Sequence, residues 1–380
     1  MAVQQDVAVR AVARVNLAAI ERNAARMRRE LSAGANAAAL CAVVKADGYG
    51  HGAVPSARAA LAGGAGWLAV AAAGEAAQLR AAGLDAPILV MGALSPAELD
   101  VALAAGADVV AWDEAFVAAV AARGGGAVHV KLDTGMGRLG TRDPDAATRV
   151  AQAADATEGV RLAGAMTHFA TADERGDAFF AEQLARFAAW APRLKAAYPS
   201  IVLHAANSAG TLRDPAAHFD MARVGIALYG LDPFGADAAA RELEPALELH
   251  SYVSAVKPIA PGESAGYGRR FVATTPTHTA TVPIGYGDGV RRALTNNLDV
   301  LVRGVRRPLV GTVSMDNITL DVGSPPAAAV GEPVVLIGVQ GEERISAEEM
   351  AQRLETINYE VTCGLPARVP RLYHHDGEPT

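Results

Sequence analysis

Residues 40–52, with the sequence LCAVVKADGYGHG, join a short apolar run to a glycine-rich turn through Lys45. The apolar run has the composition of a buried β-strand, and the glycines allow the backbone to wrap closely around a bound group. Only four of the 34 Lys and Arg residues are lysine. Because an amine can lose its proton and a guanidinium hardly can, Lys45 is a candidate for covalent chemistry on a carbonyl. The plainer alternative is a strand-end lysine that extends its ammonium group into solvent.

The run at residues 40–44 is the first of several short apolar runs that alternate with helical patterns. Near-continuous hydrophobic strands separated by helices indicate a parallel sheet that is covered on both faces. Eight such strands close a (β/α)8 TIM-like barrel, which is the fold class predicted here. A doubly wound open sheet is the alternative, but no G-x-G-x-x-G turn follows the first strand. The predicted strands are residues 40–44, 67–71, 87–91, 107–112, 127–132, 162–167, 201–205 and 222–229.

The pattern changes after about residue 233, where strand-like runs separated by Pro and Gly replace the strand-helix alternation. We therefore expect a barrel domain at residues 12–240 and a mostly β C-terminal domain at residues 241–380, which also includes residues 1–11. One late helix is signalled by the capping-box pattern at Ser346 and should reach about residue 357. The predicted strands of this domain are residues 252–259, 280–284, 300–302, 309–313 and 333–337.

Bulk composition narrows the class of function. The 380 residues are 51% hydrophobic and 20% charged, with a net charge of −7. No basic stripe indicates nucleic-acid binding, and no apolar run reaches the ~20 residues of a membrane-spanning helix. The N-terminus lacks the features of a signal peptide, and Cys41 and Cys363 are too few for a disulfide framework. We expect a cytoplasmic protein that acts on small molecules and binds neither nucleic acid nor membrane.

Polar motifs follow the C-terminal ends of the predicted strands, where barrels of this kind place their active sites. A lysine that can form a Schiff base, a serine with backbone amides for a phosphate, and cations around a ring are what a pyridoxal phosphate site requires. Each residue taken alone also has a structural explanation, such as a core histidine, an ion pair, a helix cap or a tight turn. The motif residues outside Lys45 are Lys131, His168, Asn207, Ser208, Arg223 and Gly225.

The stretch VKADGYGHG at residues 44–52 resembles the cofactor-attachment motif of bacterial alanine racemases. The resemblance covers essentially the whole chain, and six spaced motifs are far more specific than one. The others, in order, are KLDTGMGR at 131–138, THFA at 167–170, RVGI at 223–226, AGYG at 265–268 and SMD at 314–316. Many relatives have cysteine where this chain has Ser314.

The resemblance implies a role for each site residue. Lys45 would carry pyridoxal 5'-phosphate as a Schiff base and serve as one catalytic base, and Tyr267 of a second subunit would be the other. Lys131 would be carbamylated to steady Arg138, which approaches the cofactor and the substrate carboxylate. No metal is implied. The remaining implied contacts are Tyr49, Ser208, Gly225, Ile226 and Tyr359 around the phosphate, His168 and Arg223 at the pyridine nitrogen, Asn207 elsewhere on the cofactor, and Met315 and Asp316 at the substrate.

The implied activity is the interconversion of L-alanine and D-alanine by a two-base mechanism on a pyridoxal phosphate aldimine. The implied protein is a homodimer with shared active sites that supplies D-alanine for peptidoglycan. Alternatives are a broad-specificity or serine racemase, a barrel-type pyridoxal phosphate amino-acid decarboxylase, and a cofactor carrier without turnover. Such decarboxylases present an acidic residue to the pyridine nitrogen, where this chain has Arg223. A carrier has no need of a β domain with Tyr267.

Elementary chemistry fits these roles. Racemisation removes a proton from one face of the α-carbon and delivers one to the other, so bases on opposite sides are needed. Tyr267 needs nearby positive charge to act near neutrality, because an ordinary tyrosine has a pKa of about 10. Arg223 holds its proton tightly, so a ring nitrogen facing it stays unprotonated and the ring is a weaker electron sink. We expect this to limit transamination.

Overall fold

The structure is a computed structural model that describes residues 9–33 and 37–380. The chain forms two compact units. Unit 1 holds Pro245–Thr380 together with the N-terminal residues up to Ala19, and unit 2 holds Ile20–Glu244. Residues 1–8, which we assigned to the β domain, lie outside the described residues. Helix α1 (Leu17–Ser32) begins in unit 1 and continues in unit 2.

Unit 2 is a closed barrel of eight parallel strands, β2 to β9, which confirms the predicted fold class. Strand β2 pairs with β3 on one side and with β9 on the other, with Ala39 opposite Met221, and this pairing closes the barrel. The strands are almost completely buried because both faces are covered. Their bounds are Ala39–Val43 for β2, Trp67–Val70 for β3, Ile88–Val90 for β4, Asp108–Ala111 for β5, Gly126–Lys131 for β6, Val160–Met166 for β7, Val202–His204 for β8 and Met221–Val224 for β9.

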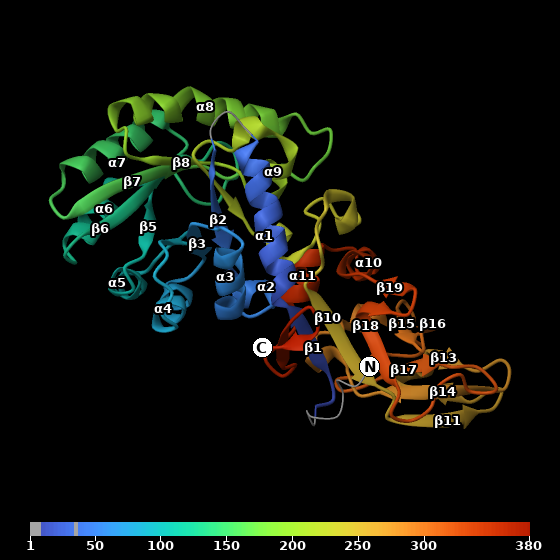
Figure 1. Ribbon diagram of the computed structural model, residues 1–380. Coiled ribbons are helices and arrows are strands. Elements are labelled where there is room, and N and C mark those ends of the chain that lie inside the picture. The colour runs from blue at the N-terminus through green and yellow to red at the C-terminus, as the bar shows by residue number, and fades with distance from the viewer. Residues whose placement is uncertain (1–8, 34–36) are drawn as a thin grey trace. The chain divides into compact units, whose positions relative to one another are not determined.

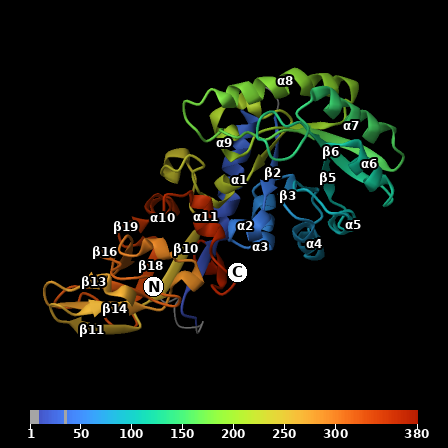
Figure 2. The ribbon, with the colours of Figure 1, turned by 180° about the vertical axis from the view of Figure 1, so that it is seen from behind.

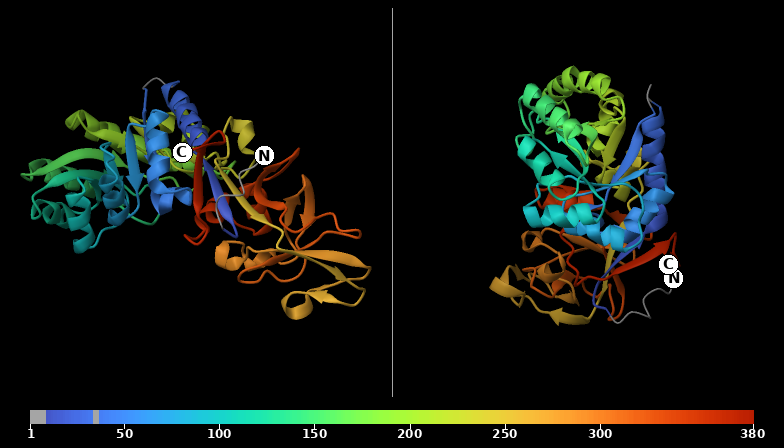
Figure 3. Two further views of the ribbon diagram at one scale, coloured as in Figure 1. Left: turned by 60° about the horizontal axis from the view of Figure 1, so that its bottom comes forward. Right: turned by 90° about the vertical axis from the view of Figure 1, so that its left-hand side faces the viewer.

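Helices connect these strands and lie around the outside of the barrel (Figures 1 and 2). Several begin with a side chain that accepts a hydrogen bond from a free backbone N–H of the first turn, as Ser95 does from Glu98 and Asp113 from Phe116. Figure 3 shows the strands of unit 2 enclosed by these helices. The segment α2 (Lys45–Tyr49) is a left-handed turn that follows β2, and the helices are α3 (Ala53–Ala62), α4 (Ala73–Ala81), α5 (Pro96–Ala104), α6 (Glu114–Ala121), α7 (Pro144–Ala156), α8 (Phe179–Ala197) and α9 (Ser208–Arg213).

All eight predicted barrel strands are present, but the last one, predicted at residues 222–229, is extended only in its first half. Strand β9 ends at Val224, and Ile226–Tyr229 forms a 3₁₀ helix, η2. Gly225 between them has φ −115° and ψ −93°, which ends the extended backbone. The Tyr229 hydroxyl donates to the Val43 carbonyl at 3.1 Å. The apolar residues of this segment are therefore buried as a turn of helix beneath the barrel rim rather than as a longer strand.

Unit 1 is mostly β, as predicted. An eight-stranded sheet, a three-stranded sheet and a two-stranded hairpin account for its strands. The first sheet comprises β1 (Val12–Asn16), β10 (Leu247–Tyr252), β15 (Asp299–Val302), β16 (Val305–Pro308), β18 (Pro333–Gln340), β19 (Glu343–Ile345), β20 (Arg371–His375) and β21 (Glu378–Pro379). The others comprise β11 (Ala255–Ile259), β14 (Thr277–Val282) and β17 (Ile318–Asp321), and β12 (Ser264–Ala265) with β13 (Phe271–Val272).

Two predicted strands of this unit need correction. The single run 252–259 is divided, since β10 ends at Tyr252 and β11 begins at Ala255. The run 309–313 has only one bridging residue, Leu309. Gly311 has φ +77°, and its backbone N–H donates to the Asn296 side chain, so the backbone leaves the extended conformation there.

The late helix is shorter than predicted. Helix α10 spans Ala347–Arg353 and is capped by Ser346, whose Oγ accepts from the Glu349 N–H at 3.1 Å. A separate helix, α11 (Asn358–Cys363), follows. Within the described ranges, no helix combines the length and the apolar character needed to cross a membrane.

Candidate active site

Lys45 follows strand β2 and begins a turn whose backbone is left-handed. Ala46, Asp47 and Tyr49 have φ values of 52°, 52° and 53°, and Gly48 has 61°. Residues other than glycine rarely adopt this conformation, which costs about 1–2 kcal/mol each. The turn places Tyr49 against Lys45, with the Lys45 Nζ 5.9 Å from the centre of the Tyr49 ring. Strain of this kind persists where a site requires it.

Two carboxylates hold this strained turn. The Ala46 backbone N–H donates to the Glu75 side chain at 2.6 Å, and Asp47 accepts from the backbone N–H of Ala53 at 2.9 Å. Glu75 also accepts from the N–H of Ala71 at 2.8 Å, which ties the turn to the end of the neighbouring strand β3. Glu75 is a residue that the sequence analysis missed.

A hydroxyl and backbone amides meet at the end of strand β9. The Ser208 Oγ accepts from the Gly225 N–H at 3.0 Å and from the Ala227 N–H at 3.4 Å. A Cβ atom at Gly225 would lie 2.4 Å from the Tyr49 hydroxyl oxygen, so only glycine leaves room for that hydroxyl. Tyr49, Ser208, Gly225 and Ile226 therefore lie together, as a phosphate group requires.

Asn207 has a structural part in this arrangement. Its Oδ1 accepts from the Gly210 N–H at 2.8 Å and so caps helix α9. Because Asn207 provides the cap, the Ser208 hydroxyl is left to accept from Gly225.

Arg223 is a buried cation at the centre of the barrel end. Its Nη1 donates to the Nδ1 and the carbonyl of His204 at 2.8 and 3.0 Å. Its Nη2 donates to the carbonyls of Thr167 and Ala205 at 2.7 and 3.0 Å and lies 3.2 Å from His168 Nδ1. Burial lowers the pKa of Arg223 to about 10, so the side chain is still charged at neutral pH.

The fifth N–H of Arg223 is different. Its Nε is buried and has no hydrogen-bond partner among the described residues. A buried donor without a partner is costly, and a pyridine nitrogen is a suitable acceptor. Together with the hydroxyls and amides around Gly225, this donor shows that the residues present fit pyridoxal phosphate.

His168 lies beside Arg223 as a neutral imidazole. Burial, followed by the positive charges of Arg223 and Lys131, holds the pKa of His168 well below its usual range. A neutral ring leaves Nδ1 available to accept from Arg223, in agreement with the 3.2 Å separation.

Lys131 ends strand β6 and is only 4% exposed. Burial first, and then the positive charges of Arg223 and Arg138, lower its pKa to about 8. About a tenth of this amine is therefore uncharged and nucleophilic at pH 7, far more than for an ordinary lysine.

Asp133 organises the loop that carries Arg138. Although burial raises the pKa of Asp133, hydrogen bonds from Gly137, Gly135 and Arg142 lower it below its usual value. The N–H groups of Gly135 and Gly137 donate at 3.0 and 3.1 Å to its Oδ1. Arg138 is exposed at the tip of this loop.

In unit 1, Tyr267, Met315 and Asp316 lie on one surface. They line a hollow of about 520 Å³ with Gly266, Thr312, Ser314, Asn317 and Thr319. Tyr267 is 74% exposed and Met315 is 52% exposed, which is unusual for side chains of this size. The Thr312 hydroxyl donates to the Tyr267 carbonyl at 2.6 Å and fixes the short helix η4 (Tyr267–Arg269).

Asp316 is held by two arginines that the sequence analysis missed. Its carboxylate pairs with Arg368 and with Arg10, the latter at 3.4 Å, and Arg368 also binds Asp288 at 2.9 Å. Hydrogen bonding and charge from Arg368, followed by Arg10, lower the pKa of Asp316. Tyr359 lies in helix α11 of this unit, and its contact with the cofactor phosphate stays a prediction.

A further buried group was missed behind Arg223. Asp108, His129 and His204 are hydrogen-bonded in sequence, at 3.1 Å from Asp108 to His129 and 2.8 Å from His129 to His204. The sequence held one signal, since His129 lies between the apolar residues Val128 and Val130 of a buried strand.

Comparison with known proteins agrees with this geometry. The family model "Alanine racemase, N-terminal domain" matches residues 15–233, and "Alanine racemase, C-terminal domain" matches residues 246–373. The chain is 42% identical over 367 residues to alanine racemase of Symbiobacterium thermophilum, covering 95% of this chain and 96% of that protein. It is 42% identical over 377 residues to alanine racemase 1 of Bacillus subtilis, covering 96% and 93%.

The structural comparison gives the same result. The crystal structure of alanine racemase from Bacillus anthracis with bound L-Ala-P matches with a TM-score of 0.89 and 35% identity, over 98% of this chain and 97% of that one. Both domains of this chain therefore match the two domains of alanine racemases, in the same order and over nearly their full length. This chain belongs to the alanine racemase family.

Proposed function

We propose that the active site of this protein combines Lys45 of one chain with Tyr267 of a second chain in a homodimer. The chain is a pyridoxal phosphate-dependent isomerase that interconverts L-alanine and D-alanine and so supplies D-alanine for peptidoglycan. The observation that carries the proposed site is the set of groups around the barrel end: the Lys45 amine, the hydroxyls of Tyr49 and Ser208, and the unpartnered Nε of Arg223.

When bound, pyridoxal phosphate supplies an electron sink that makes the α-hydrogen of alanine acidic. Lys45 and Tyr267 are proposed to hold and move protons at the α-carbon from opposite faces. Tyr49, Ser208 and the amides of Gly225 and Ile226 would hold the phosphate, with Asn207 and Tyr359 beside them.

Arg223 is proposed to donate its Nε–H to the pyridine nitrogen. Because its guanidinium keeps its proton, that nitrogen stays unprotonated, and proton return at the wrong carbon is disfavoured. His168 would support Arg223 from the other side of the guanidinium, where it already lies 3.2 Å away. The cationic Arg223 also argues against the decarboxylase alternative, which calls for an acidic residue at this point.

Lys131 is proposed to be carbamylated. The ammonium group would first lose one proton, and the resulting amine would add to carbon dioxide with loss of a second, so that a buried cation is replaced by an anion near Arg138. The lowered pKa of about 8 favours this reaction, and the new charge would orient Arg138 toward the substrate carboxylate. Carbon-13 NMR after incubation with labelled bicarbonate should show one carbamate signal that is absent from Lys131→Gln. The same spectrum from both proteins would remove this part of the proposal.

The dimer proposal rests on the exposed surface of unit 1. Tyr267 and Met315 are large side chains left open beside a hollow of about 520 Å³, and a two-fold dimer would bring each copy's hollow to the other copy's barrel. In this arrangement Met315 and Asp316 line the substrate pocket. We further propose that residues 12–240 act as the cofactor domain, that the remaining residues act in the partner's site, and that the protein works in the cytoplasm.

The direct test is racemisation of L-alanine by the purified protein, followed by loss of optical rotation. Lys45→Ala and Tyr267→Phe should each lower kcat by about 10²–10⁴-fold, the range for a lost acid–base group. Lys257→Ala and Tyr198→Phe are matched controls, because Lys257 lies on the exposed strand β11 and Tyr198 follows helix α8. Full activity in either site variant would exclude that residue as a base.

A further inference from the structure

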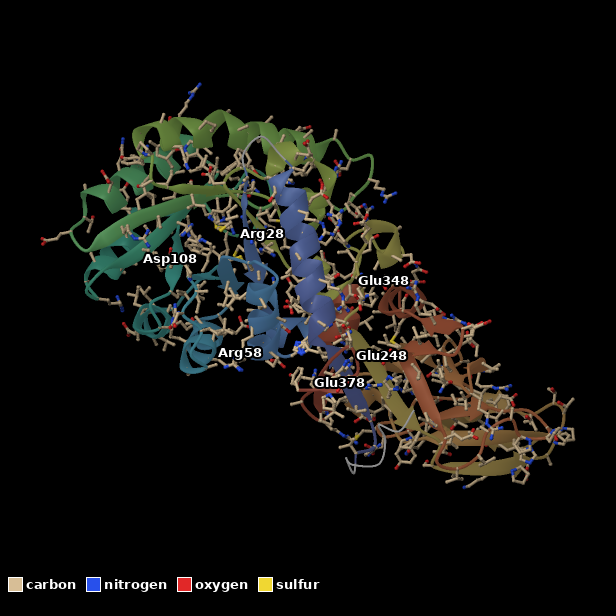
Figure 4. The ribbon with its side chains drawn as sticks, in the orientation of Figure 1. Arg28, Arg58, Asp108, Glu248, Glu348 and Glu378 are labelled. Atoms are coloured by element: carbon tan, nitrogen blue, oxygen red, sulfur yellow. The ribbon has the colours of Figure 1, made fainter. Side chains whose placement is uncertain are left out.

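A chain of buried polar side chains runs through the interior of the barrel. His204 Nδ1 lies 2.8 Å from Arg223 Nη1, and His204 Nε2 lies 2.8 Å from His129 Nδ1. His129 Nε2 in turn lies 3.1 Å from Asp108 Oδ2. Both histidines are 0% exposed, and Asp108 is 8% exposed. Asp108, labelled in Figure 4, is the first residue of β5, so the chain runs from the N-terminal end of the barrel toward the site.

The positions of the protons in this chain follow from donor and acceptor chemistry. A guanidinium has no acceptor, so the Nδ1 of His204 must accept and carries no proton. His204 therefore has its one proton on Nε2, and this proton is donated to His129. The Nδ1 of His129 is then the acceptor, and its own proton lies on Nε2 and points to the carboxylate of Asp108. All three hydrogen bonds donate in the same direction.

The barrel is shaped around the imidazole of His129. A Cβ atom at Gly164 in strand β7 would lie 2.2 Å from the Nδ1 of His129, so a side chain at this position would displace the ring. On another side the Trp67 ring meets His129 edge-on, with centroids 5.9 Å apart and an interplanar angle of 83°. Neighbours that enclose a ring in this way fix its plane as well as its place.

These hydrogen bonds leave Arg223 with one N–H donor, Nε–H, that has no partner among the described residues. His204 takes one N–H through its ring and another through its carbonyl, and the carbonyls of Thr167 and Ala205 accept from Nη2. Four of the five N–H groups are thereby engaged, and Nε–H remains. Rotation of the guanidinium would break several of these bonds at once.

We propose that Asp108, His129 and His204 are positioning residues that fix the orientation of Arg223 through a one-directional relay of hydrogen bonds. The proposal rests on the proposed role of Arg223 at the pyridine nitrogen. The anion at one end and the cation at the other align the dipoles of the two imidazole rings. Successive hydrogen bonds in such a relay also polarise one another, which strengthens each of them. A His204 ring with its proton on Nδ1 would face Arg223 with a second donor and leave a buried N–H unsatisfied.

The first test reads the positions of the protons directly and does not depend on a change in activity. Long-range ¹H–¹⁵N NMR of the cofactor-bound protein, labelled at histidine nitrogens, reports which ring nitrogen carries the proton. Signals are assigned with His129→Gln and His204→Gln. Both residues should be neutral with the proton on Nε2. A proton on Nδ1 of either ring, or a doubly protonated ring, would overturn the relay.

The second test removes the charge at the far end of the relay. Asp108→Asn should lower kcat about tenfold, the size expected for one charge-assisted hydrogen bond in a buried network, with KM for alanine unchanged. It should also shift the ¹⁵N signal of the ring nitrogen in labelled, bound pyridoxal phosphate. Asp220→Asn is the matched control, because Asp220 precedes β9 at the same end of the barrel and pairs with Lys195 at 2.6 Å. Equal effects of the two substitutions on the ring-nitrogen signal would overturn the proposal.

Gly164→Ala offers a perturbation that changes no charge. It should displace His129 and give the same shift of the ring-nitrogen signal as Asp108→Asn, and an unshifted signal would count against the relay. Failure of the relay and failure of the proposed function are distinguishable. A protein that racemises alanine with a proton on His204 Nδ1 refutes the relay alone, and one with the stated protonation but no racemisation refutes the function alone.

Discussion

The Tyr49 hydroxyl occupies the space that a side chain at Gly225 would fill, with only 2.4 Å between its oxygen and the position of a Cβ atom. The two residues come from opposite ends of the barrel sequence and meet because strands β2 and β9 are neighbours. The absence of a side chain at residue 225 is therefore what leaves room for the Tyr49 hydroxyl.

Gly225→Ala should displace Tyr49 and weaken cofactor binding by about ten- to hundredfold, because overpacking a tight contact costs about 1–3 kcal/mol. Titration of the cofactor-free protein with pyridoxal phosphate, followed by absorbance, measures the change. In a Tyr49→Ala background the same substitution should have little further effect. Gly66→Ala is the control, because a Cβ there meets nothing within 4 Å. Equal affinities of the Gly225→Ala and Gly66→Ala proteins would contradict this account.

Lys131 should make stability depend on pH in a defined window. Its pKa is about 8 in the folded protein and 10.5 ordinarily, so the unfolded chain binds more protons between these values and stability rises with pH across them. The charged form is penalised by about 3 kcal/mol below the window. In carbon dioxide-free buffer, the stability of the natural protein relative to Lys131→Met should therefore increase from pH 8 to 10.5. Parallel pH curves for the two proteins would mean that the amine is not desolvated.

Arg223→Glu should raise transamination relative to racemisation. A carboxylate lets the pyridine nitrogen take up a proton and strengthens the electron sink, which favours proton return at the cofactor. Pyruvate formation from alanine, divided by the racemisation rate, gives the ratio. Arg193→Glu, on helix α8, provides the same charge change elsewhere on unit 2. An unchanged ratio in Arg223→Glu would show that the arginine does not control the reaction outcome.

Arg368→Ala should loosen the segment that carries Met315 and Asp316. Asp316 would retain only Arg10 as a partner, and we expect KM for alanine to rise about tenfold with a smaller change in kcat. Arg303→Ala is a suitable control, since Arg303 also pairs with a carboxylate, that of Glu332. A KM equal to that of the control would indicate that the segment keeps its shape without Arg368.

Much of the barrel could be predicted because its strands are continuous apolar runs and its motifs follow strand ends. The prediction of a strand at residues 226–229 was wrong because buried apolar residues suit a strand and a 3₁₀ helix equally well. The prediction of a strand at residues 310–313 was wrong because Gly311 adopts a positive φ. Its backbone N–H donates to the side chain of Asn296, which lies 15 residues away in the sequence.

The site was predictable only where its residues form local motifs. The left-handed turn at Ala46 and Asp47 has no local signal, because these residues adopt it only under tertiary restraint from Glu75 and Ala53. The pairing of Asp108 with His129 and of Arg10 with Asp316 depends on contacts across the fold. Such partners become visible only when the strands are placed side by side.

Lys45 and Tyr267 of different chains are proposed to form one active site, and a mixed dimer can show whether they do. Lys45→Ala and Tyr267→Phe chains with different affinity tags are co-expressed, and the heterodimer is isolated through both tags. In this heterodimer one site has both residues and the other has neither, so we predict about half of the natural racemase activity per dimer, while each homodimer is inactive. A heterodimer as inactive as its parents would contradict the shared site.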